Sequence, residues 1–100
     1  MSEQQGGFDL TDLRGRVCVI TGAGNNGIGW GLAVHAATQL GMHVVLVDLH
    51  ENVVRDAVAQ LKARIEREGL ENRVLGIARD DTDPDQLASC LIEIQVAFRG

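Results

Sequence analysis

The chain has 100 residues, of which 45% are hydrophobic, so we expect it to fold, either as one small domain or as part of a larger one. Its 9 basic and 14 acidic residues give a formal net charge of −5, which argues against nucleic acid and anionic membrane surfaces, because both favour clustered lysine and arginine. No apolar run is long enough to span a bilayer and the first residues lack a secretory signal pattern, so we expect a cytoplasmic protein with no membrane partner.

The first elements follow a polar, glycine-containing start. We expect residues 1–9 to be a flexible amino-terminal segment and residues 10–100 to form one partial domain. The β-branched run Val17–Thr21 predicts a strand, and helical spacing predicts a helix over residues 27–40. The apolar face expected for this helix consists of Ile28, Leu32, Ala36 and Leu40.

A glycine-rich turn joins this strand to this helix. Glycines allow a tight turn and a close backbone approach to phosphate, while the helix N-terminus offers unpaired N–H groups and a positive dipole end. The sequence therefore predicts a phosphate cradle. Its candidate residues are Thr21, Gly22, Gly24, Asn25, Asn26, Gly27, Ile28 and Gly29.

The residues around the turn separate three nucleotide motifs. A P-loop needs Lys and then Ser or Thr where this chain has Ile28 and Gly29, so that interpretation fails. Residues 22–27 satisfy the dinucleotide pattern GxGxxG. A methyltransferase ranks last, because the first strand ends in Ile20 and Thr21 without an acid.

The second strand is predicted over residues 42–48 as a continuous apolar run, typical of a parallel sheet covered on both faces. It ends in Asp48, 21 residues after Gly27, where a carboxylate can accept hydrogen bonds from a ribose diol. We take Asp48 as a cofactor-binding residue, with Leu49 beside it. Asp48 favours NAD over NADP, because it would repel a 2′-phosphate.

The remaining elements are a helix over residues 51–68, a strand over 73–78 and a helix capped by Asp83. Pro84 and Gln86 at the first and third helical positions support that start. The apolar stripe expected for the second helix is Val54, Ala57, Val58, Leu61 and Ile65, and that for the third is Leu87, Leu91, Ile94 and Phe98.

The acidic run over residues 80–85 invites a calcium site. A calcium loop would need Gly and Glu where the chain has Gln86 and Ile92, so we expect no metal. Instead, one carboxylate after the third strand is expected to face the nucleotide. Cys18 and Cys90 form no CxxC pattern, and we interpret them as core residues.

Together these elements predict an α/β fold: a Rossmann-type doubly wound parallel sheet, truncated after about three strands in the order 3-2-1 and three helices. The first two helices should cover one face of the sheet and the third helix the other. The strand Val17–Thr21 would then have an open outer edge, which predicts self-association through that edge.

The glycine turn after Thr21, Asp48 and Asp80 resemble the short-chain dehydrogenase/reductase family. The resemblance runs from about Leu10 to the end of the chain and would correspond to the amino-terminal half of a family member. It implies that the glycine turn holds the pyrophosphate, that Asp48 binds the adenosine ribose and that Asp80 contacts adenine. The turn is one residue longer than the usual TGxxxGxG, and Asp81 replaces a usually apolar residue, so both Asp80 and Asp81 are candidates.

The family's catalytic Tyr-xxx-Lys pair is absent, because the chain contains no tyrosine. We therefore identify no catalytic residue and expect the dinucleotide-binding part of an NAD(P)-dependent oxidoreductase that is inactive alone. A small alcohol or carbonyl substrate is expected only for a longer parent protein. The alternative is a non-catalytic module that binds a dinucleotide or docks on a partner.

Overall fold

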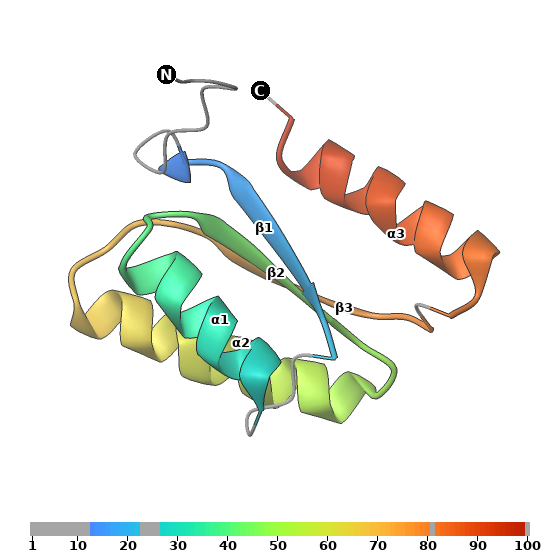
Figure 1. Ribbon diagram of the computed structural model, residues 1–100, viewed down its shortest axis with the longest axis horizontal. Helices are drawn as coiled ribbons and strands as arrows, with labels where there is room; N and C mark the ends of the chain where they lie inside the picture. The colour runs from blue at the N-terminus through green and yellow to red at the C-terminus, as the bar shows by residue number, and fades with distance from the viewer. Residues whose placement is uncertain (1–12, 23–26, 81, 100) are drawn as a thin grey trace, which may run out of the picture.

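Strands and helices alternate along the chain. The computed structural model describes residues 13–22, 27–80 and 82–99. In order, the elements are β1 (Val17–Thr21), α1 (Ile28–Thr38), β2 (His43–Asp48), α2 (Glu51–Arg67), β3 (Val74–Ala78) and α3 (Pro84–Ala97) (Figure 1). Their bounds lie close to the ranges predicted from the sequence. The expected segment 1–9 lies outside the described residues.

The three strands form one parallel sheet in the order β1-β2-β3, which confirms the predicted order 3-2-1. The pairing runs from Val17 opposite His43 to Thr21 opposite Val47. β2 and β3 pair in the same direction, ending with Asp48 opposite Ala78. All three strands therefore end at the same edge of the sheet.

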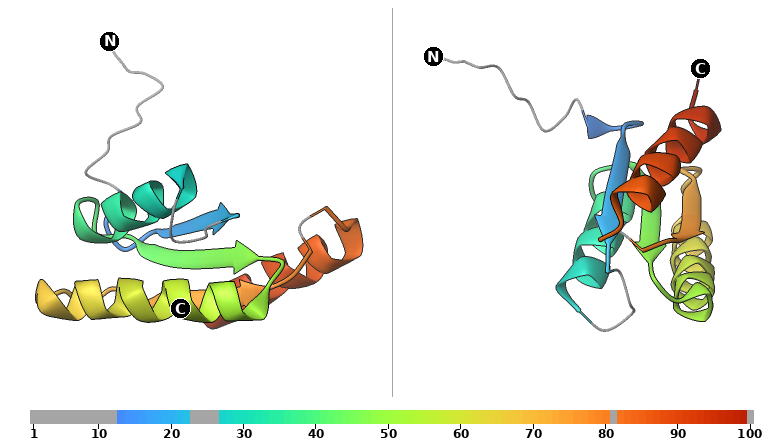
Figure 2. Two further views of the ribbon diagram at one scale, coloured as in Figure 1. Left: turned by 90° about the horizontal axis from the view of Figure 1, so that it is seen from below. Right: turned by 90° about the vertical axis from the view of Figure 1, so that its right-hand side faces the viewer.

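The sheet is covered on both faces, as expected for a doubly wound fold (Figure 2). α1 and α2 pack on one face, where Leu46, Leu61 and Ala33 belong to one buried cluster. α3 packs on the other face, where Val45 and Ile94 belong to a second cluster. The middle strand β2 contributes to both clusters, and for this reason its sequence is continuously apolar.

The buried face of α1 differs from the predicted one. Ile28 and Leu32 are 85% and 57% exposed, whereas Ala33 and Ala37 are fully buried and Ala36 nearly so. The prediction placed the largest side chains inward. Ala36 is buried as predicted and Leu40 packs against the core. Ala33 and Ala37 take the inward places expected for Ile28 and Leu32, because a helix that lies close to a sheet has room only for small side chains there.

α3 differs from its prediction in one position. Ile94 is buried as expected, but Leu91 is half exposed and Cys90 takes the buried place. Cys18 packs against the cluster on the opposite face of the sheet. The two thiols are therefore separated by the sheet, which confirms their interpretation as packing residues rather than a redox pair.

Among residues 13–22, 27–80 and 82–99, no helix is long and apolar enough to cross a membrane. Within the same residues, β1 has β2 as its one neighbour, so its outer edge is open as predicted. Val19 on that strand is 42% exposed.

Gly76 in β3 lets α2 lie close to the sheet. A Cβ atom placed there would come within 2.5 Å of Val54 Cγ1 and 2.6 Å of Val58 Cγ2. Gly76→Ala should therefore lower the free energy of unfolding by about 1–3 kcal/mol, the usual cost of overpacking a core. Denaturant unfolding would measure this change.

Two further variants make the test specific. Gly31 in α1 has open space where its Cβ would point, so Gly31→Ala should instead stabilise the fold by about 0.8–1 kcal/mol through helix propensity. Adding Val58→Ala to Gly76→Ala should cost less than the sum of the two single changes, because it removes one of the clashing methyl groups. Strict additivity would contradict the proposed clash.

The thiols also predict a pH dependence. Burial raises the pKa of both the Cys18 and the Cys90 thiol, and for Cys90 the nearby Arg79 guanidinium partly opposes this. A thiol whose pKa is higher in the folded state than in the unfolded state stabilises the fold fully at any pH below the unfolded-state pKa. This stabilisation is lost as the pH rises through the folded-state pKa. We expect the denaturation midpoint to fall as the pH rises above about 8.5.

The double variant Cys18→Ala/Cys90→Ala is the comparison for this experiment. The chain has no tyrosine and a single lysine, Lys62, so few other side chains titrate in this range. The double variant should lose most of the alkaline dependence. An unchanged dependence would show that groups other than the thiols cause it.

Candidate functional site

The sequence-predicted site residues gather at the edge where the strands end. Thr21 pairs opposite Val47, next to Asp48, and Asp48 pairs opposite Ala78 at the end of β3. The backbone N–H of Gly22 donates to the carbonyl of Val47 over 2.8 Å, so the turn after β1 begins beside β2. Parallel pairing thus brings residues far apart in the sequence to one edge.

The turn itself starts and finishes at glycines. Gly22 has φ +65, a left-handed conformation that glycine adopts without strain, and among the described residues other than its chain neighbours no heavy atom lies within 4 Å of the place where its Cβ would be. The predicted turn residues Gly24, Asn25 and Asn26 lie outside the described residues. The structure therefore describes Gly22 and Gly27, at the two ends of the predicted phosphate cradle, and not the residues between them.

α1 begins directly after Gly27, which has no side chain that could cap the helix. The Gly27 backbone is extended, and the first turn of the helix contains no acidic residue. The first intrahelical bond at this end runs from the Gly31 N–H to the Gly27 carbonyl over 3.1 Å. The preceding N–H groups, of Ile28, Gly29 and Trp30, have no such acceptor within the helix, so they can bind an anion.

Asp48 lies at the last position of β2 and is partly exposed. Its Oδ1 accepts a hydrogen bond from the His50 backbone N–H over 3.2 Å, which orients the carboxylate. Leu49, the next residue, is 61% exposed. A ligand that reaches across the ends of β1 and β2 would meet both side chains.

Asp80 follows β3 and is held by its neighbour Thr82. Its Oδ1 accepts hydrogen bonds from the Thr82 hydroxyl over 2.6 Å and from the Thr82 backbone N–H over 3.0 Å. These bonds, the hydroxyl first, lower the pKa of the Asp80 carboxyl below its ordinary value. The carboxylate is therefore ionised at neutral pH. Asp81, the other candidate, lies outside the described residues.

Two side chains that the sequence did not single out as site residues fix the connection between β3 and α3. Gln86 Oε1 accepts from the backbone N–H of Asp80 over 2.9 Å. Arg79 Nη1 donates to the Ala78 carbonyl over 2.8 Å, and its Nη2 lies 2.9 Å from Glu93 Oε2 on α3. The sequence marked Gln86 only as a helix-start signal, and nothing in the pattern pointed to Arg79.

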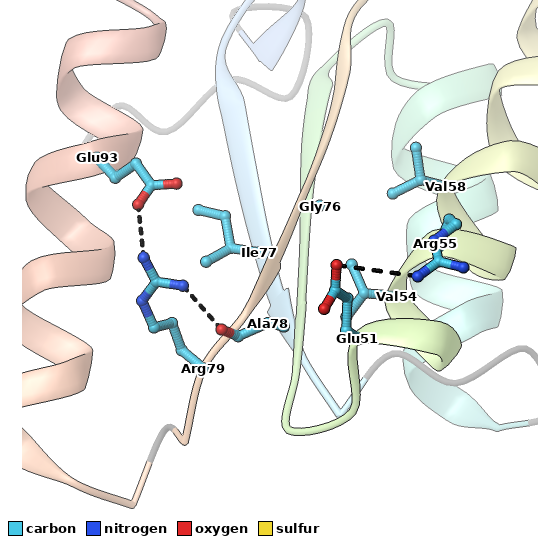
Figure 3. Close-up of a pocket in the computed structure, with 9 residues that line it drawn as sticks. All are labelled: Glu51, Val54, Arg55, Val58, Gly76, Ile77, Ala78, Arg79 and Glu93. Carbon is cyan, nitrogen blue, oxygen red and sulfur yellow. Dashed lines mark hydrogen bonds and ion pairs between the residues drawn. The ribbon is translucent and has the colours of Figure 1, made fainter.

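A cavity of about 470 Å³ lies elsewhere, between α2, the outer edge of β3 and α3 (Figure 3). Two ion pairs line it: Glu51 with Arg55 and Arg79 with Glu93. Its described lining includes neither the glycine turn nor Asp48. This cavity is therefore distinct from the site at the strand ends, and its charged side chains form ion pairs with one another.

The arrangement at the strand ends fits one kind of ligand. The helix N-terminus with no acid in its first turn suits a phosphate, and an oriented carboxylate at the end of β2 suits a hydroxyl donor. No group of three or more potential metal ligands occurs among the described residues.

The chain is similar in fold and sequence to solved structures of short-chain dehydrogenases and reductases. L-sorbose reductase from Gluconobacter frateurii, complexed with NADPH and L-sorbose, matches with 31% identity and a TM-score of 0.73, over 93% of this chain and 32% of its own. A short chain dehydrogenase/reductase from Burkholderia phymatum in complex with NAD matches with 31% identity and a TM-score of 0.72, over 86% of this chain and 28% of its own. A short chain dehydrogenase from Mycobacterium smegmatis gives 27% identity and a TM-score of 0.75, over 97% and 37%.

The chain spans about a third of the length of these structures. No protein-family model and no curated protein matches the chain.

Proposed function

We propose that this chain, which belongs with the short-chain dehydrogenases/reductases as a counterpart of their amino-terminal, cofactor-binding part, binds a nicotinamide dinucleotide at the edge where its strands end. The likeness to structures complexed with NADPH or NAD supports the cofactor class. The glycine turn would bind the pyrophosphate through backbone N–H groups, and the carboxylates of Asp48 and Asp80 would bind the adenosine end.

One observation carries the proposal: α1 follows β1 and begins with no acid in its first turn, and Asp48 ends the adjacent strand β2, so both belong to the same edge of the sheet. A dinucleotide contains both an anionic pyrophosphate and a neutral ribose diol. The pyrophosphate needs hydrogen-bond donors, and the ribose diol needs an acceptor. The N–H groups of α1 and the Asp48 carboxylate would supply them at this edge.

We further propose NAD rather than NADP as the preferred cofactor. The similar structures include one with NADPH and one with NAD, so the likeness itself favours neither. Asp48 supplies the preference, because a carboxylate at this position accepts hydrogen bonds from a free ribose diol and repels a 2′-phosphate. Arg55, the nearest arginine that follows along the sequence, already pairs with Glu51.

The bound cofactor would supply hydride transfer to or from an alcohol or carbonyl. A proton donor for the developing alkoxide would also be required, and tyrosine, which serves this purpose in the family, does not occur among these 100 residues. We propose that these residues bind and orient the dinucleotide without catalysing its reaction alone. Any substrate would belong to a longer protein that contains them.

The alternative is a module that binds a dinucleotide or a partner without chemistry. The open outer edge of β1, with Val19 exposed on it, would also allow a second copy of the chain to pair there. Self-association and a cytoplasmic location stay predictions. The dinucleotide site is common to both functions, so cofactor binding is tested first.

The double variant Asp48→Ser/Leu49→Arg tests the cofactor preference. It removes the acid that accepts the ribose diol and adds a cation beside it. Calorimetric titration should show NAD binding weakened by about tenfold or more, since a hydrogen bond to a charged group contributes about 1.5–3 kcal/mol. NADP binding should become tighter than in the unaltered protein.

Asp56→Ser is the matched control, because it removes an exposed acid from α2 and should leave both affinities unchanged. An unaltered preference in the double variant would refute the assignment of Asp48. Absence of saturable binding of either dinucleotide to the unaltered protein would refute the proposed function itself.

A further inference from the structure

Gln86 makes a contact that its place in the sequence does not explain. At the third position of a helix, glutamine ordinarily reaches back to the backbone N–H of the capping residue. Here the N–H of the cap Asp83 donates to the Asp80 carbonyl over 3.2 Å. Gln86 Oε1 instead accepts the backbone N–H of Asp80 itself, over 2.9 Å.

The same side chain also reaches the helix cap. Gln86 Nε2 lies 3.5 Å from Asp83 Oδ2, while Asp83 Oδ1 accepts the N–H of Asp85 over 3.0 Å. Gln86 thus connects the residue that follows β3 to the first turn of α3. Because α3 is anchored in the core by Cys90 and Ile94, this connection relates Asp80 to a fixed element.

The carboxylate of Asp80 is oriented from the other side. Both hydrogen bonds from Thr82 end at Oδ1. The backbone N–H of Arg79 donates to the carbonyl of Asp48 over 2.9 Å, which fixes the preceding residue against β2. Because the Thr82 bonds use Oδ1, we assign Oδ2 to a ligand at the strand ends.

We infer that Gln86 is a positioning residue for the adenine end of the dinucleotide: by binding the Asp80 backbone, it holds the Asp80 carboxylate where Oδ2 can accept the amino group of adenine. The inference rests on the proposed function. It assigns Gln86 no contact with the cofactor, and its effect passes through Asp80 alone. The lowered pKa of Asp80 agrees with this, because an ionised carboxylate acts only as an acceptor.

A pair of dinucleotides separates this effect from a general loss of structure. NAD carries the adenine amino group, whereas nicotinamide hypoxanthine dinucleotide has a carbonyl oxygen in its place and a hydrogen on ring N1; the ribose, pyrophosphate and nicotinamide parts are the same. Gln86→Met removes the acceptor and keeps the length of the side chain and its helix propensity. We expect this variant to bind NAD about threefold to tenfold more weakly, the range for one lost hydrogen bond.

For nicotinamide hypoxanthine dinucleotide, Gln86→Met should bind within about twofold of the unaltered protein, the scatter expected of independent sites. Gln86→Glu keeps an oxygen acceptor at the same place and should restore most of the NAD affinity. Gln95→Met makes the same substitution at an exposed position of the same helix and should change neither affinity. Melting temperatures of the variants, measured alongside, report on their folding.

The possible outcomes distinguish a failure of the positioning role of Gln86 from a failure of the proposed dinucleotide site. If Gln86→Met leaves NAD affinity unchanged, or weakens both dinucleotides equally, the positioning role is refuted while the dinucleotide site stands. If the unaltered protein binds neither dinucleotide, the proposed function fails and the role of Gln86 fails with it.

Discussion

The parallel pairing of three strands is the constraint on which the candidate site depends. Since β1, β2 and β3 run in the same direction and in register, their carboxyl ends lie along one edge of the sheet. Thr21, Asp48 and Asp80, which are separated by more than a helix in the sequence, therefore meet there. The interactions proposed for the dinucleotide depend on this alignment. The helices packed on the two faces of the sheet hold the strands in place.

Much of this arrangement could be predicted from the sequence, because its signals are local and agree with one another. The continuous apolar run of β2 indicated a strand covered on both faces, and both buried clusters include its side chains. Asp83 and Pro84 marked the start of α3, where the structure shows Asp83 capping the helix. Turn glycines and strand ends follow short-range rules, so the edge that carries the site was predictable as well.

The remaining features depend on contacts between elements that lie far apart in the sequence, and local sequence patterns do not reveal these contacts. Periodicity alone placed Leu32 inward, whereas the close approach of α1 to the sheet buries Ala33 and leaves Leu32 exposed. Gly76 showed no turn pattern, since its role is to admit Val54 and Val58 of a helix far away in the sequence. The contact of Gln86 with the Asp80 backbone likewise depends on how the connection bends, and a helix-start rule assigns that side chain another partner.

The central claim is that one dinucleotide occupies the edge where the strands end. Amide chemical shifts recorded during a titration with NAD test it most directly. The account predicts saturable shifts at Gly22, Gly27 and Gly29 and next to Asp48 and Asp80, all fitting one dissociation constant. Saturable shifts confined to the cavity between α2, β3 and α3, or no saturable shifts, would contradict it.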